Sequence, residues 1–480
     1  MLPTLLPGFA GTVLPGWLRD RLRAGLGGVC LFAQNISSLD QLRALTEAIR
    51  AENPYAIIAI DEEGGDVTRL FAATGAPFSG NAVLGRLDDL KITREAAAMI
   101  GWSLRRVNCN VNFAPCVDIN SRSDNPVIGV RSFGSDAELV SRHGQAWVAG
   151  LQSTGVAATA KHFPGHGDTA QDSHVSLPVV DCSLEELHRR ELLPFDAAIQ
   201  AGCQLIMTSH IVLPQVDPEH PATMSRILLQ DLLRGELGFS GVIVSDALDM
   251  AGASGSLGMA GAAVAALRAG CDLLCLGTDN TNDQIAEIEQ AVSMAVANGD
   301  LAFARVSEAT DRVRLLASEL EAERRLAGRP PRGAPGWPGS EAKLINTLDV
   351  QSEAWDWRAR AAGRYTVVRL EADPNIAVGY TPWGPFTMPA FNAQPTRVIT
   401  PDHSELPPFQ SGQPVLVVGR DIHRHRFARE AVDRLRSQHR DVLVVDMGWP
   451  SADRRYADVA TFGASRLMGD VLLRWLAGSS

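Results

Sequence analysis

The chain has 480 residues, of which 45% are hydrophobic, and a formal net charge of −11 with a pI near 5.5. This length predicts two domains, or one large barrel plus a smaller unit. The acidic balance argues against nucleic acids and anionic membranes as partners. No uninterrupted apolar run reaches the roughly 18 residues that a membrane span needs.

The cysteines and the N-terminus both bear on where the protein works. Seven cysteines, an odd number with no CxxC pair, favour buried thiols in a reducing compartment over a disulfide framework. The first seven residues lack a basic region and are interrupted by prolines, which argues against a secretory signal. We therefore expect a soluble, cytoplasmic protein.

Short apolar runs alternate with amphipathic stretches over the first two thirds of the chain, a pattern typical of βα units. The expected strands span residues 4–9, 28–33, 56–60, 111–115, 156–160, 204–208, 242–245 and 272–277. Eight such units over about 250 residues or more predict an α/β fold, a closed (β/α)8 TIM barrel. An open doubly wound sheet is less favoured because the glycine-rich segment 25–28 precedes a strand instead of following one.

The last third of the chain predicts a second, smaller domain. A helix over 302–325 ends the barrel domain, expected at 1–325, and a proline- and glycine-rich linker follows at 326–342. Three strands (365–370, 414–419 and 442–446) and two helices (427–438 and 464–476) then predict a small α/β domain over 343–480.

Polar side chains follow the expected barrel strands, where a barrel would bring them onto one face. They are Asp61, Glu62, Asp118, Lys161, His162, Ser209, His210 and Asp246. Some have ordinary structural explanations, since Asp118 can cap the residues after it and His210 can be a hydrogen-bonded interior histidine. As a set they indicate a catalytic pocket.

The densest polar segment, Lys161–His174, places one lysine, three histidines and two carboxylates within fourteen residues. A serine triad is disfavoured because Asp172, Ser173 and His174 are chain neighbours and no G-x-S-x-G elbow occurs. A metal site is disfavoured by loose spacing and by Lys161; its ligands would be His162, His166, Asp168, Asp172 and His174.

Glycosidic bond cleavage fits these groups better. It requires a carboxylate nucleophile and a proton donor on either side of the scissile bond. Asp246, at the end of a strand, can be the nucleophile. Asp172 and His174 can form a dyad in which the carboxylate orients an imidazole that donates and later accepts a proton.

The first 325 residues closely resemble family 3 glycoside hydrolases, specifically the β-N-acetylglucosaminidase branch. The matching motifs are Ile60-Asp61-Glu62-Glu63-Gly64-Gly65 with Arg69, Asn112-Phe113-Ala114-Pro115 with Asp118, Arg131-Ser132-Phe133-Gly134, Lys161 through Thr169, Asp172-Ser173-His174, and Ser245-Asp246 with Met250. Departures from the commoner pattern are Glu62, Asp66, Val130 and Ala247. The tail resembles the flavodoxin-like second domain of the same family.

The resemblance implies a role for each matching residue. Asp246 would be the nucleophile, His174 the acid/base and Asp172 its partner, and no metal or cofactor would be needed. The residues that would hold the sugar are Asp61, Arg69, Arg131, Lys161 and His162, while His166 and Asp168 would brace the loop.

These roles imply a retaining glycosidase that releases terminal N-acetyl-β-D-glucosamine from chitin-derived or cell-wall oligosaccharides through a covalent glycosyl-enzyme. Two alternatives stay open at this stage. One is a phosphorylase, in which phosphate replaces water, and the other is a catalytically silent sugar-binding protein.

Overall fold

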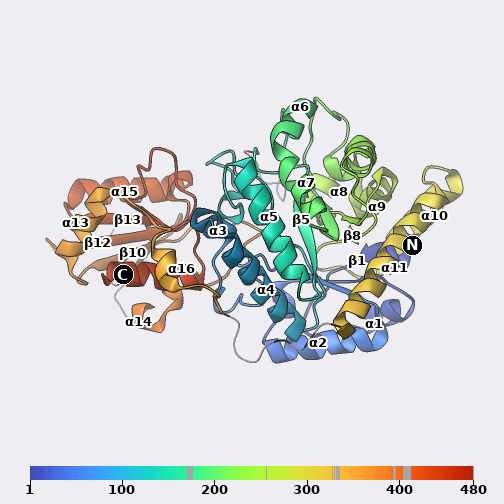
Figure 1. The fold of residues 1–480 in the computed structure, drawn as a ribbon, viewed down its shortest axis with the longest axis horizontal. Helices are drawn as coiled ribbons and strands as arrows, with labels where there is room; N and C mark the ends of the chain where they lie inside the picture. The colour runs from blue at the N-terminus through green and yellow to red at the C-terminus, as the bar shows by residue number, and fades with distance from the viewer. Residues whose placement is uncertain are drawn as a thin grey trace. The chain divides into compact units, whose positions relative to one another are not determined.

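The computed structural model describes residues 1–169, 177–255, 257–326, 328, 330, 336–392, 396–403 and 412–478. The chain divides into two compact units (Figure 1). The first comprises Met1–Glu63, Leu90–Ile119 and Ser135–Pro335, and the second comprises Gly64–Asp89, Asn120–Gly134 and Gly336–Ser480. The second unit thus includes two segments of the N-terminal half, which the position of the linker does not anticipate.

The described part of the first unit contains eight parallel strands. They are β1 (Leu5–Leu6), β2 (Gly28–Leu31), β3 (Ile57–Ile60), β4 (Val111–Asn112), β5 (Ala157–Phe163), β6 (Leu205–Thr208), β7 (Val242–Val244) and β8 (Leu274–Cys275). Strands β2 to β7 form one sheet in chain order, and β1 pairs with β8. A bridge between Val244 and Leu273 joins β7 to β8. The Cys30 N–H donates to the Pro7 carbonyl at 2.9 Å and joins β2 to the end of β1. The predicted barrel is confirmed.

Helices surround these strands (Figure 1). The main ones are α1 (Gly16–Arg23), α2 (Leu39–Glu52), α4 (Leu90–Arg106), α5 (Ala137–Gln152), α7 (Leu193–Gln200), η6 (Ile227–Glu236), α9 (Gly258–Ala269) and α10 (Asn282–Asn298). Helix α5 illustrates why they form. The Asp136 side chain caps it by accepting from the Leu139 N–H, and Val140, Trp147 and Leu151 recur at helical spacing on its buried face.

Helix α11 (Phe303–Leu326) has a different place. Its Val313, Leu316 and Leu320 pack against alternate residues of the strands, such as Ile57 and Leu205. Alternate residues of a barrel strand point inward. Helix α11 therefore covers the inward-facing layer at the amino-terminal ends of the strands, and the carboxyl-terminal ends remain the place for chemistry.

The second unit contains one six-stranded sheet in the order β11-β10-β12-β13-β14-β9. The strands are β9 (Asp349–Val350), β10 (Thr366–Leu370), β11 (Thr396–Ile399), β12 (Val415–Gly419), β13 (Val442–Asp446) and β14 (Val459–Ala460). Only β9 is antiparallel to its neighbour. The five parallel strands thus lie in the order 2-1-3-4-5 of flavodoxin-like sheets.

Helices cover both faces of this sheet. One face packs on α13 (Ser352–Ala361) and α16 (Arg466–Leu476), with Trp357 and Trp475 in the shared core. The other packs on α15 (Arg426–Gln438). Helix α3 (Asn81–Leu87) adds Ala82 and Val83 to the first of these cores, which is why residues 64–89 group with the second unit. Shorter helices are α6 (Leu184–Glu186), α8 (Ala251–Ser254), α12 (Glu341–Ile345) and α14 (Pro389–Asn392).

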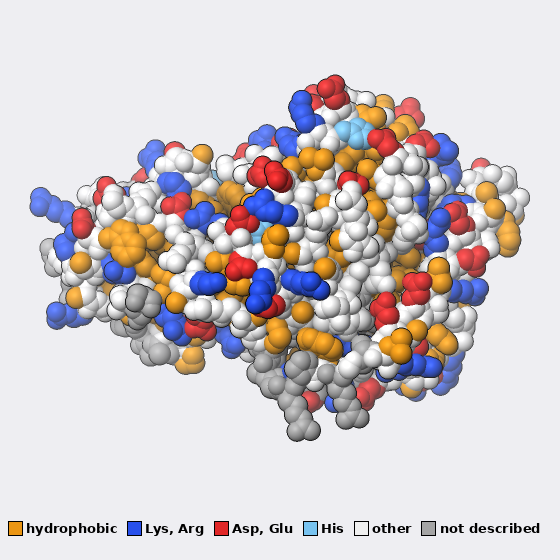
Figure 2. Space-filling view, viewed as in Figure 1, with side chains coloured by type: hydrophobic (Ala, Val, Ile, Leu, Met, Phe, Trp, Pro, Cys, Tyr) orange, Lys and Arg blue, Asp and Glu red, His pale blue; other side chains and the backbone are white. Residues whose placement is uncertain are grey.

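The structure gives the state of the cysteines, the character of the helices and the distribution of surface charge. All seven cysteines are buried and free of disulfides. Within the described ranges, no helix combines the length and apolarity needed to cross a membrane. Basic and acidic side chains are interspersed on the face that Figure 2 shows.

Candidate active site

Lys161 is a buried cation held between two carboxylates. Its side chain is 2% exposed, and its Nζ lies 2.7 Å from Asp61 Oδ1 and 2.8 Å from Glu63 Oε1. Asp61 directly follows β3, and Glu63 is two residues further along the chain. Strand β5 continues through Phe163, so the prediction that the strand ends at residue 160 was wrong. A charged residue can continue a buried strand here because the residues after β3, two strands away in the sheet, supply opposite charge.

Asp118 orients the ring of His162. The His162 Nδ1 donates to Asp118 Oδ2 at 2.7 Å, and the backbone N–H of His166 donates to Asp118 Oδ1 at 2.7 Å. Burial would raise the pKa of Asp118, but His162 and His166 hold it well below its usual range. Asp118 is therefore an anion that fixes the imidazole and the turn after β5, beyond the capping role that its sequence context suggested.

His166 links the ends of β5 and β7 electrostatically. Burial, followed by the charge of His162, lowers the pKa of His166 to about 4, while the carboxylate of Asp246 acts in the opposite direction. The rings of His162 and His166 lie 6.0 Å apart between centroids. His166 is thus neutral at pH 7 and lies within the field of Asp246. The carboxyl-terminal ends of β5 and β7 therefore lie at the same end of the barrel.

Backbone contacts hold the carboxylate of Asp246. It follows β7, and its Oδ1 accepts from the Ala247 N–H at 2.8 Å. The Ala247 carbonyl accepts in turn from Nε2 of His210 at 3.0 Å, and Nδ1 of His210 lies 2.9 Å from the Thr223 hydroxyl. His210 is fully buried. It is therefore the hydrogen-bonded interior histidine that the sequence allowed, and it braces the peptide next to Asp246.

Four further predicted residues either belong to the second unit or lie outside the described residues. Arg69 and Arg131 belong to the second unit. There the Arg69 Nη2 donates to the Ala377 carbonyl at 2.8 Å, and Arg131 Nη1 donates to the Val127 carbonyl at 3.2 Å. Asp172 and His174 lie outside the described residues, and their roles stay predictions. Within the first unit, the structure brings Asp61 and Lys161 into contact.

Two of the residues that differ from the commoner family pattern, Asp66 and Ala247, form contacts that the structure describes. The Asp66 carboxylate accepts from the Ala464 N–H at 2.7 Å, within the second unit. Burial raises the pKa of Asp66 to about 6. Ala247 provides its backbone N–H and carbonyl to the contacts around Asp246, so no side chain at this position is needed for them.

Sequence reasoning missed Glu63 as the second partner of Lys161 and Asp118 as the partner of His162. The first had a signal, since Asp61 and Glu63 are two residues apart in an extended segment and can point the same way. The second had none in local spacing, because Asp118 and His162 are 44 residues apart.

Among the described residues, one group has the residue types and closeness to hold a metal ion. Possible ligand atoms of Cys116, Asp118 and His162 lie within 4.8 Å of one another. However, Asp118 Oδ2 already accepts from His162 Nδ1 and, at 3.2 Å, from Cys116 Sγ. An ion would have to replace both hydrogen bonds, which makes this group a poor resident site.

We expect activity to survive exhaustive dialysis against EDTA, because the one candidate ligand group in the described part of the chain already forms this hydrogen-bonded cluster. Metal content by mass spectrometry and kcat before and after dialysis provide the measurement. A loss of activity that Zn²⁺ restores would contradict the prediction and reinstate a metal centre.

Replacing Lys161 by Met should destabilise the first unit strongly. The change leaves two carboxylates without their shared cation, and breaking a buried ion pair in this way costs about 3–5 kcal/mol. We expect the apparent Tm to fall by about 6 °C or more. Lys91→Met is the matched control, since the Lys91 side chain is 83% exposed and should leave Tm nearly unchanged. Equal Tm values for the two variants would show that the pairing contributes little.

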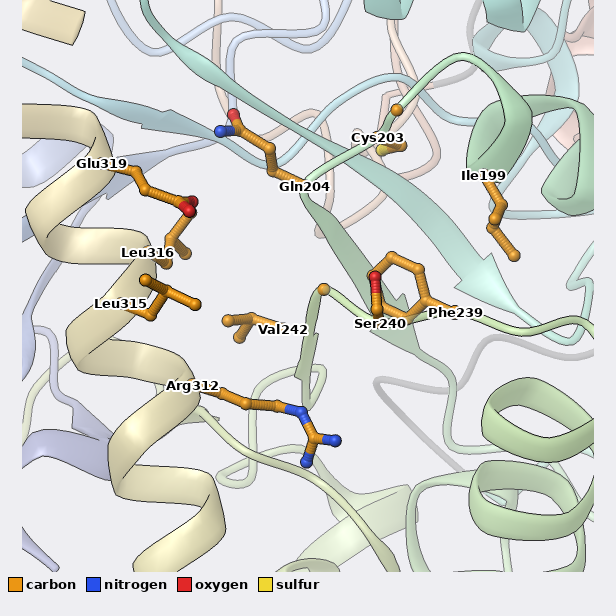
Figure 3. Close-up of a pocket in the computed structure, with 12 residues that line it drawn as sticks. Ile199, Cys203, Gln204, Phe239, Ser240, Val242, Arg312, Leu315, Leu316 and Glu319 are labelled. Atoms are coloured by element: carbon orange, nitrogen blue, oxygen red, sulfur yellow. The ribbon is translucent and has the colours of Figure 1, made fainter.

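The first unit also has a cavity of about 280 Å³, whose lining residues Figure 3 shows. Gln204 and Gly241, which precede β6 and β7, line it together with Arg312, Leu316 and Glu319 of α11. It is therefore at the amino-terminal ends of the strands, whereas Asp246 follows a carboxyl-terminal end. The cavity and Asp246 are thus at opposite ends of the barrel strands.

Comparisons with known proteins identify the family of the first unit. Residues 19–316 match the model of the "Glycosyl hydrolase family 3 N terminal domain". The chain is 40% identical over 287 residues to Beta-hexosaminidase A of Pseudoalteromonas piscicida, covering 55% of this chain and 48% of that protein. It is 39% identical over 291 residues to Beta-hexosaminidase of Pseudomonas aeruginosa, covering 60% of this chain and 86% of that protein.

The whole chain also has a structural counterpart. A glycoside hydrolase family 3 beta-N-acetylglucosaminidase from Paenibacillus sp. str. FPU-7 superposes with a TM-score of 0.84 at 28% identity, covering 99% of this chain and 95% of that one. The chain spans about half the length of the Pseudoalteromonas relative but most of the Pseudomonas one. With its family model matched across the barrel and a carboxylate at the end of β7, the chain belongs to glycosyl hydrolase family 3.

Proposed function

We propose that this chain is a retaining β-N-acetylhexosaminidase that releases terminal N-acetyl-β-D-glucosamine from oligosaccharides. The observation that carries the proposal is the position of Asp246, held at the carboxyl-terminal end of β7 and within the electrostatic field of the β5 end. The names of the relatives at about 40% identity support the substrate class. Chitin-derived and cell-wall fragments are the candidate natural substrates.

The reaction would proceed in two displacements. Asp246 attacks the anomeric carbon as the glycosidic C–O bond breaks, and His174, paired with Asp172, donates a proton to the leaving oxygen. Water then attacks the same carbon and releases Asp246, while His174 takes the proton from the water. Two inversions at one carbon give net retention.

Charged side chains would hold the sugar. A hydroxyl-rich ligand needs converging hydrogen-bonding groups. The partly exposed carboxylate of Asp61 supplies an acceptor, and the Lys161 ammonium beside it supplies a cation. Asp118 fixes His162 in place for the same purpose. We propose the same sugar-binding role for Arg69 and Arg131, on the basis of the family motifs to which they belong.

We further propose that the enzyme works in the cytoplasm on soluble oligosaccharides. Seven buried cysteines without a disulfide support a reducing compartment. The interspersed surface charges in Figure 2 give no support to a nucleic-acid partner.

The test compares chromogenic N-acetyl-β-glucosaminides with β-glucosides, each with and without millimolar phosphate. We expect kcat/KM to favour the acetamido sugar by roughly tenfold or more, about 1.4 kcal/mol of transition-state discrimination. The product should be free N-acetylglucosamine in both buffers. A dominant sugar 1-phosphate would instead identify a phosphorylase, and binding without turnover would identify a sugar-binding protein. Equal kcat/KM values would return the chain to a broader β-glucosidase activity.

A further inference from the structure

Three contacts fix the first residues of the loop that follows β5. The His166 N–H donates to Asp118 Oδ1 at 2.7 Å. Gly167 lies so close to the Ile119 carbonyl that a Cβ would meet its oxygen at 1.7 Å, which only glycine avoids. Asp168 Oδ2 accepts from Nη2 of Arg190 at 2.6 Å. The loop is therefore held on the barrel up to residue 168.

Arg190 and Glu191 contact this loop at two points. They belong to η4 (Leu187–Glu191), a single π-helical turn. The Arg190 Nε donates to Glu191 Oε1 at 2.6 Å, so one guanidinium bridges the carboxylates of Glu191 and Asp168. Glu191 itself packs beneath Gly165, where a Cβ would lie 2.7 Å from its Oε2. The pair thus holds the loop at residues 165 and 168.

The position of Asp168 limits where the residues after it can be. Asp172 follows four residues later and His174 six residues later. Four residues span at most about 14 Å when fully extended. An acid/base group must lie within hydrogen-bonding distance of the leaving oxygen to transfer a proton. A misplacement of about 1 Å can lower the rate roughly 10²-fold. An anchor at Asp168 therefore affects catalysis through geometry.

We propose that Arg190 is a positioning residue for the acid/base group: by bridging Asp168 and Glu191 it fixes the chain at residue 168, four residues before Asp172 and six before His174. This rests on the proposed function, because it assumes that His174 protonates the leaving group. Arg190 itself would touch no substrate.

Loss of the bridge should cost little stability, which separates positioning from folding. The Arg190 and Asp168 side chains are 38% and 32% exposed, and such ion pairs contribute about 0–1 kcal/mol. Burial, reinforced by Asp118 and Asp168 and opposed by Arg190, raises the pKa of Glu191 to about 7. Without Arg190, Glu191 can take up a proton instead of remaining a buried anion.

The experiment uses Arg190→Gln, Arg190→Lys and Asp168→Asn in the full chain, with Arg189→Gln as control, since Arg189 is an exposed arginine of the same turn. Each variant is assayed for kcat, KM and Tm on a nitrophenyl N-acetyl-β-glucosaminide and on the N-acetylglucosamine disaccharide. Departure of nitrophenolate needs little proton donation, whereas departure of a sugar hydroxyl needs it fully.

We expect Arg190→Gln to lower kcat on the disaccharide about tenfold or more beyond its effect on the nitrophenyl substrate, with KM and Tm little changed. Arg190→Lys should restore part of the loss, and adding Asp168→Asn to Arg190→Gln should cause little further loss. Equal losses on both substrates, losses that follow Tm, or no loss at all would overturn the positioning role. A wild-type enzyme inactive on both substrates would instead overturn the proposed function, and this role with it.

Discussion

Replacing Asp246 by Ala should lower kcat on N-acetyl-β-glucosaminides by about 10⁴-fold or more, because the variant lacks the group that forms the glycosyl-enzyme. The Ala247 N–H that now holds the carboxylate remains, so the backbone after β7 has no reason to move. The free energy of unfolding should change little. Asp231→Ala is a matched control, since the Asp231 side chain is 54% exposed and contacts Arg226 at 3.3 Å.

Two further measurements identify the nucleophile directly. A fluorinated slow substrate should label the wild-type peptide that contains Asp246, as found by mass spectrometry. Azide added to Asp246→Ala should occupy the space of the missing carboxylate and give the α-glycosyl azide, because a single displacement inverts the anomeric carbon. Label on a different residue, or a β-glycosyl azide from this variant, would assign the nucleophile elsewhere.

The second large effect concerns His174. We expect His174→Ala to lower kcat on the disaccharide by about 10²–10⁴-fold, the range that general acid–base catalysis contributes. On nitrophenyl substrates the loss should be much smaller in the first step, because that leaving group departs without a proton. Asp172→Asn should show the same pattern more weakly, since the imidazole remains.

Azide again separates the roles. In His174→Ala the glycosyl-enzyme can still form from a nitrophenyl substrate, and azide attacks it without base assistance. The product should be the β-glycosyl azide, opposite in configuration to that from the Asp246 variant. His403→Ala, which changes an exposed histidine of the second unit, is the control. Equal losses on disaccharide and nitrophenyl substrates would show that His174 does not act as acid/base.

The barrel was predictable because its strands are buried on both sides. Such strands are near-continuous apolar runs, as in Ile57–Ile60 and Leu205–Thr208, and each of the eight predicted runs overlaps a strand. The limits were less accurate, as β5 shows. Its last residues include Lys161 and His162, and an apolarity rule ends the strand before them.

The strands of the second unit that were not predicted differ in length and exposure. Strands β9 and β14 have only two residues each, and β11 lies on the edge of the sheet with Ile399 as its one buried residue. Short or exposed strands bury too few side chains to leave an apolar run in the sequence. Their positions depend on pairing with a longer neighbour.

The sequence by itself determined the eight-stranded barrel, its family, and the nomination of Asp61, Lys161 and Asp246 at the strand ends. These follow from local patterns, since burial sets apolarity and strand ends carry chemistry. Only the tertiary structure decided which groups pair. Lys161 with Asp61 spans 100 residues of chain, and His162 with Asp118 spans 44. Such contacts depend on the order of the strands around the barrel, since β4 lies between β3 and β5, and that order is set by the closed barrel and by no short stretch of sequence.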